Sequence, residues 1–97
     1  YKPLILPNAK EDIKKAALWY NEQSKRLGKK FTTTVSEIVH FIRQYPKAYC
    51  IRYDDVRTAT IPTFPYMIHY TLDEKNRLVI VFSVLHTSRN PKLWKTN

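Results

Sequence analysis

The 97-residue sequence is poor in several residue types, and each shortage excludes a class of protein. Its one cysteine, Cys50, cannot form an internal disulfide, and no Cys/His spacing suits a zinc ion. Its one glycine argues against a glycine-rich cradle for phosphate. We therefore expect neither a metal ion nor an organic cofactor, and the cysteine content favours a cytoplasmic protein.

Long apolar runs are also lacking. The longest, Leu78 to Phe82, is too short to cross a bilayer, and the amino end has no apolar signal-peptide core. We expect no membrane partner. Apolar residues nevertheless make up 43% of the chain and aromatic residues 13%, which is unlike a disordered protein. A chain of this length builds one hydrophobic core, so we expect a single domain over residues 1–97.

Acidic residues are scarce. Eight Asp and Glu residues stand against seventeen Lys and Arg residues, which gives a formal net charge of +9. This charge favours an anionic macromolecule as partner, whether nucleic acid, ribosome or an acidic protein, although ordinary soluble domains also carry such charges. We expect no small-molecule substrate.

The first part of the chain predicts a strand and then a helix. The mostly apolar residues 1–6 end at Pro7, and Pro3 makes this segment an edge strand, because proline has no N–H to donate. Asn8 and Glu11 have the spacing of a capping box ahead of an apolar periodic run. A helix is therefore expected from about residue 9 to residue 26.

Gly28 is expected to close this first helix, and a second helix carries apolar residues on one face from Phe31 until Pro46 stops it. The remaining chain is rich in β-branched and aromatic residues with short breaks. It predicts strands at residues 49–53, 56–61, 66–72 and 77–85. The order predicts a two-layer α+β domain in which an antiparallel helix pair covers one face of an antiparallel meander.

The last of these strands is apolar on both faces. Leu78, Ile80 and Phe82 alternate with Val79 and Val81. Since the helix pair covers only one face of the sheet, we expect something else to cover the second face, either the chain's own tail or a partner.

Candidate chemistry gathers around the end of that strand. His86 and Arg89 follow it, and Arg57 lies on a neighbouring strand that can bring its guanidinium close. Three such groups can hold a phosphate, and an imidazole can transfer protons near neutral pH. The alternative is that both arginines pair with Asp54, Asp55 or the carboxyl terminus and that His86 merely ends a strand.

Two further clusters are weaker candidates. His69 can act as a base, but an isolated histidine on a strand is most often half-buried, and Tyr70 in the same strand is more typical of a core residue. Lys92, Trp94 and Lys95 form a basic tail whose indole can stack on bases or anchor in a protein groove. Trp94 can equally pack over the open sheet face.

The order of segments resembles the RelE/ParE superfamily of toxins from type II toxin-antitoxin systems, over almost the whole chain. The segments that carry the likeness include AYCIRYDDVRTATIP, FPYMIHY and LVIVFSVLHTSRNP. It is closest to the ParE-type branch, where an Arg on the strand after the helices, a Tyr-containing strand and a strand ending in Val-Leu-His-x-x-Arg are usual. Arg57, Tyr70 and the run from Val84 to Arg89 match these features.

The resemblance implies a cognate antitoxin that lies along the helices and the open sheet face. We expect it to contact Ile13, Ala17, Tyr20, Val79 and Val81. The surface that meets the cellular target is expected to contain Arg57, Tyr66, His86, Arg89, Lys92, Trp94 and Lys95.

The resemblance also implies two possible targets, DNA gyrase for ParE-like members and mRNA on the ribosome for RelE-like members. Nuclease members usually supply Lys and Arg on the central strands and a tail Tyr or His. This chain has Thr58 and Thr60 where lysines are usual, Met67 where an Arg is usual, and Trp94 in the tail. These departures favour a gyrase-binding toxin of the plasmid stabilisation type.

Two alternatives stay open. One is a ribosome-dependent mRNA interferase, an endoribonuclease in which His86, Arg57 and Arg89 form a smaller catalytic set. The other is a non-toxic adaptor for nucleic acid or protein on the same fold. The resemblance leaves open whether the protein is an enzyme.

Overall fold

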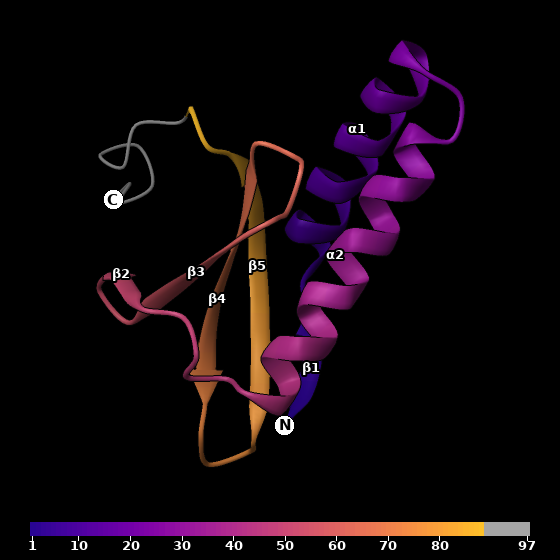
Figure 1. Cartoon of the computed structure of the whole chain (residues 1–97). Helices are drawn as coiled ribbons and strands as arrows, with labels where there is room; N and C mark the ends of the chain where they lie inside the picture. The colour runs from indigo at the N-terminus through magenta and orange to yellow at the C-terminus, as the bar shows by residue number, and fades with distance from the viewer. Residues whose placement is uncertain (89–97) are drawn as a thin grey trace.

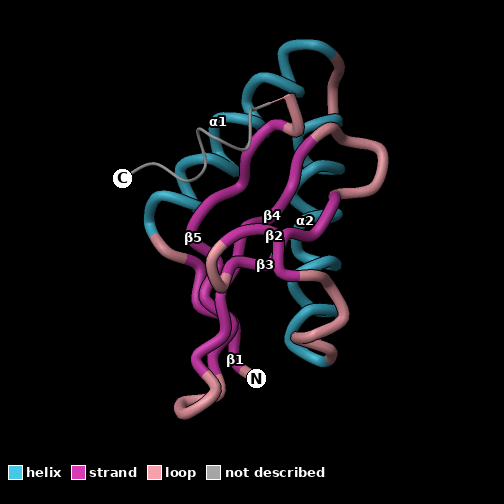
Figure 2. The backbone as a smooth tube through the Cα atoms, turned by 90° about the vertical axis from the view of Figure 1, so that its left-hand side faces the viewer, coloured by secondary structure: helices cyan, strands magenta, loops and turns pink. Residues whose placement is uncertain are grey.

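A computed structural model describes residues 1–88 and shows two helices on one face of a five-stranded sheet (Figures 1 and 2). The strand order is β1-β5-β4-β3-β2, with β1 parallel to β5 and every other pair antiparallel. The predicted α+β fold is thereby confirmed. The elements are β1 Lys2–Ile5, α1 Pro7–Gln23, α2 Leu27–Gln44, β2 Ile51–Tyr53, β3 Val56–Thr60, β4 Tyr66–Asp73 and β5 Leu78–His86.

Strand β1 lies at the edge of the sheet, as Pro3 predicts. The N–H groups of Lys2 and Leu6 donate to the carbonyl oxygens of Arg77 and Val81, both at 2.9 Å. Because alternate residues of a strand point to opposite sides, Pro3 is turned away from β5, where its missing N–H costs no hydrogen bond.

Helix α1 begins two residues before the expected start. Leu6 is its N-cap and Pro7 occupies the first turn, where a missing N–H is harmless. The capping-box prediction for Asn8 is wrong. The Asn8 side-chain amide instead donates to the carbonyl oxygen of Phe82 at 3.2 Å and lies 3.4 Å from Ser83 Oγ. It therefore ties the start of α1 to β5.

The turn between the helices also differs from the prediction. Helix α1 ends at Gln23, and Arg26 makes the turn in the left-handed region with φ 71°. Gly28 lies inside the first turn of α2, and a Cβ there would come within 2.3 Å of the carbonyl oxygen of Ala17. Because Gly28 has no side chain, the two helices can touch at this position. Gly28 does not end the first helix, although glycine is also common at helix ends.

The core lies between the helices and the sheet. Phe31 and Ile42 of α2 are fully buried, as are Val79 and Val81 of β5. Burial of each such side chain stabilises the fold by about 1.5 to 3 kcal/mol. The apolar face predicted for the second helix is confirmed, whereas placing Val79 and Val81 on a surface open to a partner is wrong, because they face the helices.

The other face of β5 carries Leu78, Ile80 and Phe82, all of them half-buried. We call these three residues the open face. None of the helices in the described part of the chain is both long enough and apolar enough to span a membrane. The tail residues Arg89, Lys92, Trp94 and Lys95 lie outside the described residues.

Candidate protein interaction site

The structure does not bring Arg57 to His86. Arg57 on β3 is the partner of Tyr70 on β4, whereas His86 on β5 is the partner of Tyr66. These two tyrosines are four residues apart on one strand, which is about 13 Å at 3.3 Å per residue. The expectation that Arg57 and His86 share one phosphate site is therefore wrong.

Arg57 is engaged by the backbone. Its Nη1 donates to the carbonyl oxygen of Tyr49 at 2.6 Å, and the hydroxyl of Tyr70 donates to the carbonyl oxygen of Pro46 at 2.9 Å. Burial raises the pKa of Tyr70 to about 12, although the charge of Arg57 acts in the opposite direction. Both side chains thus fasten the segment that follows α2 to the sheet. The expected pairing of Arg57 with Asp54 or Asp55 is not seen.

His86 is exposed, and its ring meets the Tyr66 ring edge-on, with centroids 5.2 Å apart. The backbone N–H of Ser88 donates to His86 Nδ1 at 3.0 Å, and Ser88 Oγ lies 2.8 Å from the same atom. Because a backbone N–H can only donate, Nδ1 is an acceptor, and the neutral ring carries its proton on Nε2. His86 therefore presents a donor.

His69 differs sharply from His86. It is fully buried, and its Nδ1 lies 3.0 Å from the hydroxyl of Tyr53. Burial, assisted by the charge of Arg52, lowers the pKa of His69 to about 4. The ring is therefore neutral at pH 7 and has no path to a substrate. Within residues 1–88, no group of three His, Cys, Asp or Glu side chains is placed to hold a metal ion.

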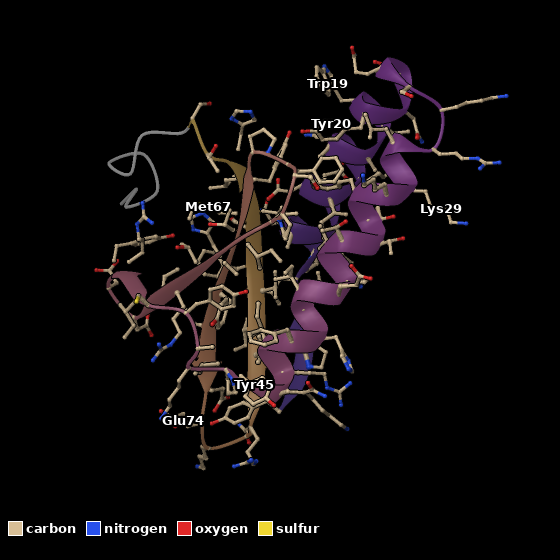
Figure 3. The ribbon with its side chains drawn as sticks, in the orientation of Figure 1. Trp19, Tyr20, Lys29, Tyr45, Met67 and Glu74 are labelled. Atoms are coloured by element: carbon tan, nitrogen blue, oxygen red, sulfur yellow. The ribbon has the colours of Figure 1, made fainter. Side chains whose placement is uncertain are left out.

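A groove lies between α1 and the adjoining ends of β4 and β5. Its volume is about 530 Å³. Trp19, which is 54% exposed, lies beside Tyr20 at the upper end of α1 (Figure 3). Burial raises the pKa of Tyr20, and Tyr66 acts in the same direction, so the Tyr20 hydroxyl stays neutral. The groove, called the end groove below, is lined by Asp12, Lys15, Ala16, Trp19, Tyr20, Pro65, Tyr66, Val84, Leu85 and His86.

The end groove unites some residues that sequence reasoning assigned to different surfaces. Tyr20 was expected to meet the antitoxin, and Tyr66 and His86 the target, yet all three line one groove. Ile13 and Ala17 are half-buried and pack against the core, so they offer a partner little surface. They face inward because they continue the buried stripe of α1.

Sequence reasoning missed two kinds of residue in this region. Leu18 and Trp19 are the large apolar side chains of α1 that remain exposed, at 55% and 54%. Asp12 was also missed: its Oδ2 accepts a hydrogen bond from the N–H of Val84 at 3.0 Å. The available signal was that Asn8 and Asp12 are polar and one helical turn apart, beside the buried stripe.

This arrangement defines a small α+β domain with an open groove flanked by exposed aromatic and basic side chains, suited to a macromolecular partner. The model of the family "ParE toxin of type II toxin-antitoxin system, parDE" matches residues 4–91, so the chain belongs to this family. It is the toxin component of a type II toxin-antitoxin system. The predicted likeness to the ParE-type branch is thereby confirmed.

Solved structures agree on the fold. The chain is similar to one described as the chromosomal ParDE TA system from P. aeruginosa, with a TM-score of 0.64 and 13% sequence identity. The match covers 88% of this chain and 94% of that chain. At this identity the likeness concerns the fold alone. A search of curated proteins finds no match.

Proposed function

We propose that this toxin arrests growth by binding DNA gyrase and that it does not cleave RNA itself. The observation that carries this proposal is the separation of Arg57 from His86. RNA cleavage needs an acid, a base and a cation around one phosphate. Among the described residues, Arg57 donates to the Tyr49 carbonyl and lies about 13 Å from His86 along β4. His69 is buried.

The surface for the target is narrower than the sequence predicts. His86 is exposed and Tyr66 half-exposed, so both can meet another macromolecule. Arg57 contributes little to target binding, because its guanidinium already donates to a backbone carbonyl. We keep Arg89, Lys92, Trp94 and Lys95 as predicted target contacts from their residue types.

A cognate antitoxin is the second partner. The net charge of +9 favours an acidic one, and the exposed Leu18 and Trp19 offer apolar anchors on α1. In this proposal they take the place of Val79 and Val81 in the predicted antitoxin surface, while Tyr20 lines the end groove beside them. We expect both complexes to form in the cytoplasm.

The test uses purified toxin in two assays, one of DNA supercoiling by gyrase and one of cell-free translation with analysis of the mRNA. We expect supercoiling to fall, mRNA to stay intact and added antitoxin to restore supercoiling. The variant His86→Gln should keep its toxicity, since a binding contact loses far less than a catalytic acid or base. Cleavage of mRNA at ribosome-bound codons, abolished in His86→Gln, would overturn the proposal in favour of an interferase. The absence of any growth arrest in cells would instead support the adaptor.

A further inference from the structure

The segment from Lys25 to Tyr45 carries an uneven share of the charge. It contains the turn before α2, the whole of α2 and the residue after it, with five basic residues and one acidic residue, Glu37. These give a charge of +4, nearly half of the +9 of the whole chain. None of the five basic residues forms an ion pair with a carboxylate of residues 1–88, where the pair seen is Lys47 with Glu74. The five are Lys25, Arg26, Lys29, Lys30 and Arg43.

The outer face of α2 carries a row of hydrogen-bond donors. Side chains three and four residues apart lie above one another on a helix, and Figure 3 shows Lys29 on the side of α2 away from the sheet. Each side chain in this row is exposed and can donate a hydrogen bond. Because α2 has 18 residues, the helix is about 27 Å long. The row, called the donor row below, consists of Lys29, Thr33, Ser36, His40 and Arg43.

The threonine hydroxyls of α2 differ in what they bind. Those of Thr32 and Thr34 donate to backbone carbonyl oxygens of the preceding turn, at 3.0 and 2.7 Å. The Thr33 hydroxyl, in the donor row, has no hydrogen-bond partner among residues 1–88. It is therefore available to a ligand, together with the charged groups on either side of it.

An exposed aromatic pair lies at the far end of this face. Phe41 is 40% and Tyr45 58% exposed, and their ring centroids are 5.1 Å apart. Tyr45 also lines a hollow of about 430 Å³ together with Tyr1 and Pro46. Figure 3 shows Tyr45 at the opposite end of α2 from Lys29. Cations in a row beside exposed rings are the arrangement by which proteins bind single-stranded nucleic acid, because the cations follow the phosphates and the rings stack on bases.

We propose that the outer face of α2 binds a single-stranded segment of nucleic acid, with its phosphates along the donor row and a base stacked on Tyr45. Charge complementarity selects this occupant. A second copy of the toxin would bring the same positive face and be repelled, and an acidic peptide would match the donor row but not the ring pair. This inference goes beyond the proposed function and does not depend on it, because it concerns the toxin without gyrase.

Fluorescence anisotropy with purified toxin tests the proposal. The probes are labelled oligo-dT, labelled oligo-U and a labelled DNA duplex of the same length, each titrated at several salt concentrations. We expect both single strands to bind, with an affinity that falls as the salt concentration rises, because phosphate contacts release counterions. The duplex should bind more weakly, because its bases are already stacked on one another. The tighter of the two single strands identifies DNA or RNA as the preferred ligand.

Two pairs of lysine substitutions test the donor row. Lys29→Ala with Lys30→Ala should weaken binding about tenfold and make the salt dependence shallower, because two cations near the phosphates are lost. Lys10→Ala with Lys14→Ala is the matched control, since it removes two exposed lysines from α1. The control pair should weaken binding about threefold or less, because it changes only the overall charge.

Substitutions of Tyr45 test the stacking contact. Tyr45→Ala should weaken binding of the single strands about fivefold or more, whereas Tyr45→Phe keeps the ring and should stay within about twofold. Circular dichroism establishes that each variant is folded. If Tyr45→Ala does not fold, the comparison of the two lysine pairs and of single strand with duplex still decides the question.

Several results would overturn the proposal. These are no binding to the wild type, equal losses in the two lysine pairs, and equal affinity for duplex and single strand. Displacement of the oligonucleotide by polyglutamate as readily as by unlabelled oligonucleotide would assign the face to an acidic protein. A dimer in sedimentation that is lost in Tyr45→Ala would assign it to a second copy. None of these results bears on the gyrase proposal, which fails only if supercoiling is not inhibited.

Discussion

Two tyrosines of β4, Tyr66 at the start of the strand and Tyr70 in its middle, have different roles. Tyr70 lies beside Arg57 on β3, and Tyr66 lies beside His86 on β5. Tyr70 is fully buried, and both Tyr70 and Arg57 donate to backbone carbonyls, so this pair supports the fold. Tyr66 is half-exposed, and its pair lines the end groove. A tyrosine next to a nitrogen-bearing side chain therefore has no fixed role, and its burial and hydrogen-bond partners decide whether it supports the fold or meets a partner.

The largest expected effect distinguishes the two tyrosines by stability. Tyr70→Ala should lower the free energy of unfolding by about 3 to 5 kcal/mol, because it empties a fully buried aromatic site. Tyr66→Ala should cost clearly less, since that ring is partly exposed. Urea denaturation at pH 7 measures both, and Tyr70→Phe isolates the hydroxyl bond to Pro46. Equal losses for the two alanine variants would contradict the distinction.

The second effect compares the buried His69 with the exposed His86. The pKa of His69 in the folded state, about 4, is below its unfolded value of 6.5. Stability is therefore complete above pH 6.5 and falls as the pH drops toward 4, by up to about 3 kcal/mol. Unfolding measured across this range should show the loss in the wild type and in His86→Gln, and a shallower slope in His69→Gln. Identical slopes in all three proteins would show that His69 is not buried in its neutral form.

A third variant tests whether Arg57 supports the fold rather than the target surface. Arg57→Ala should lower stability by about 1.5 to 3 kcal/mol, because the charged donor to the Tyr49 carbonyl is lost. Antitoxin affinity and gyrase inhibition should stay unchanged in the fraction that is folded. Lys75→Ala, at an exposed position, is the matched loss of a charge and should have almost no effect on stability. A selective loss of gyrase inhibition with unchanged stability would place Arg57 in the target surface.

The smallest effect concerns the turn between α1 and α2. Arg26 holds a left-handed backbone, which costs a residue with a side chain about 1 kcal/mol. Arg26→Gly should therefore raise the melting temperature slightly, with a gain of at most about 1 kcal/mol. Lys25→Gly, its neighbour without a positive φ, should lower stability instead. A loss in Arg26→Gly would mean that the arginine side chain contributes more than its backbone costs.

Much of the fold could be predicted because it depends on local pattern. Pro3 marks an edge strand, Pro46 stops a helix and the β-rich second half forms hairpins, and each of these follows from residue type and spacing. Gly28 and Asn8 were misassigned for a physical reason. A glycine at a helix end and a glycine at a helix contact look alike, as do an amide that caps a helix and an amide that reaches a distant strand.

The candidate site was harder to predict because it depends on register and face. A strand shows which residues alternate, but not which set faces the helices, so Val79 and Val81 were assigned to the wrong side. The distance between Arg57 and His86 depends on which residues of β3 and β5 stand opposite each residue of β4. The sequence could mark Asp12 as a polar residue beside the buried stripe of α1, but not its partner, since Val84 is 72 residues away in the chain.

Pro3 affects how readily the toxin aggregates once it is free of its antitoxin. A toxin released from its antitoxin has an uncovered edge strand. Such an edge can pair with the same edge of a second copy and lead to aggregation. Pro3 directs a ring instead of an N–H outward from β1, so this edge strand pairs poorly with a strand of a second copy. We therefore expect Pro3 to reduce edge-to-edge association of the free toxin.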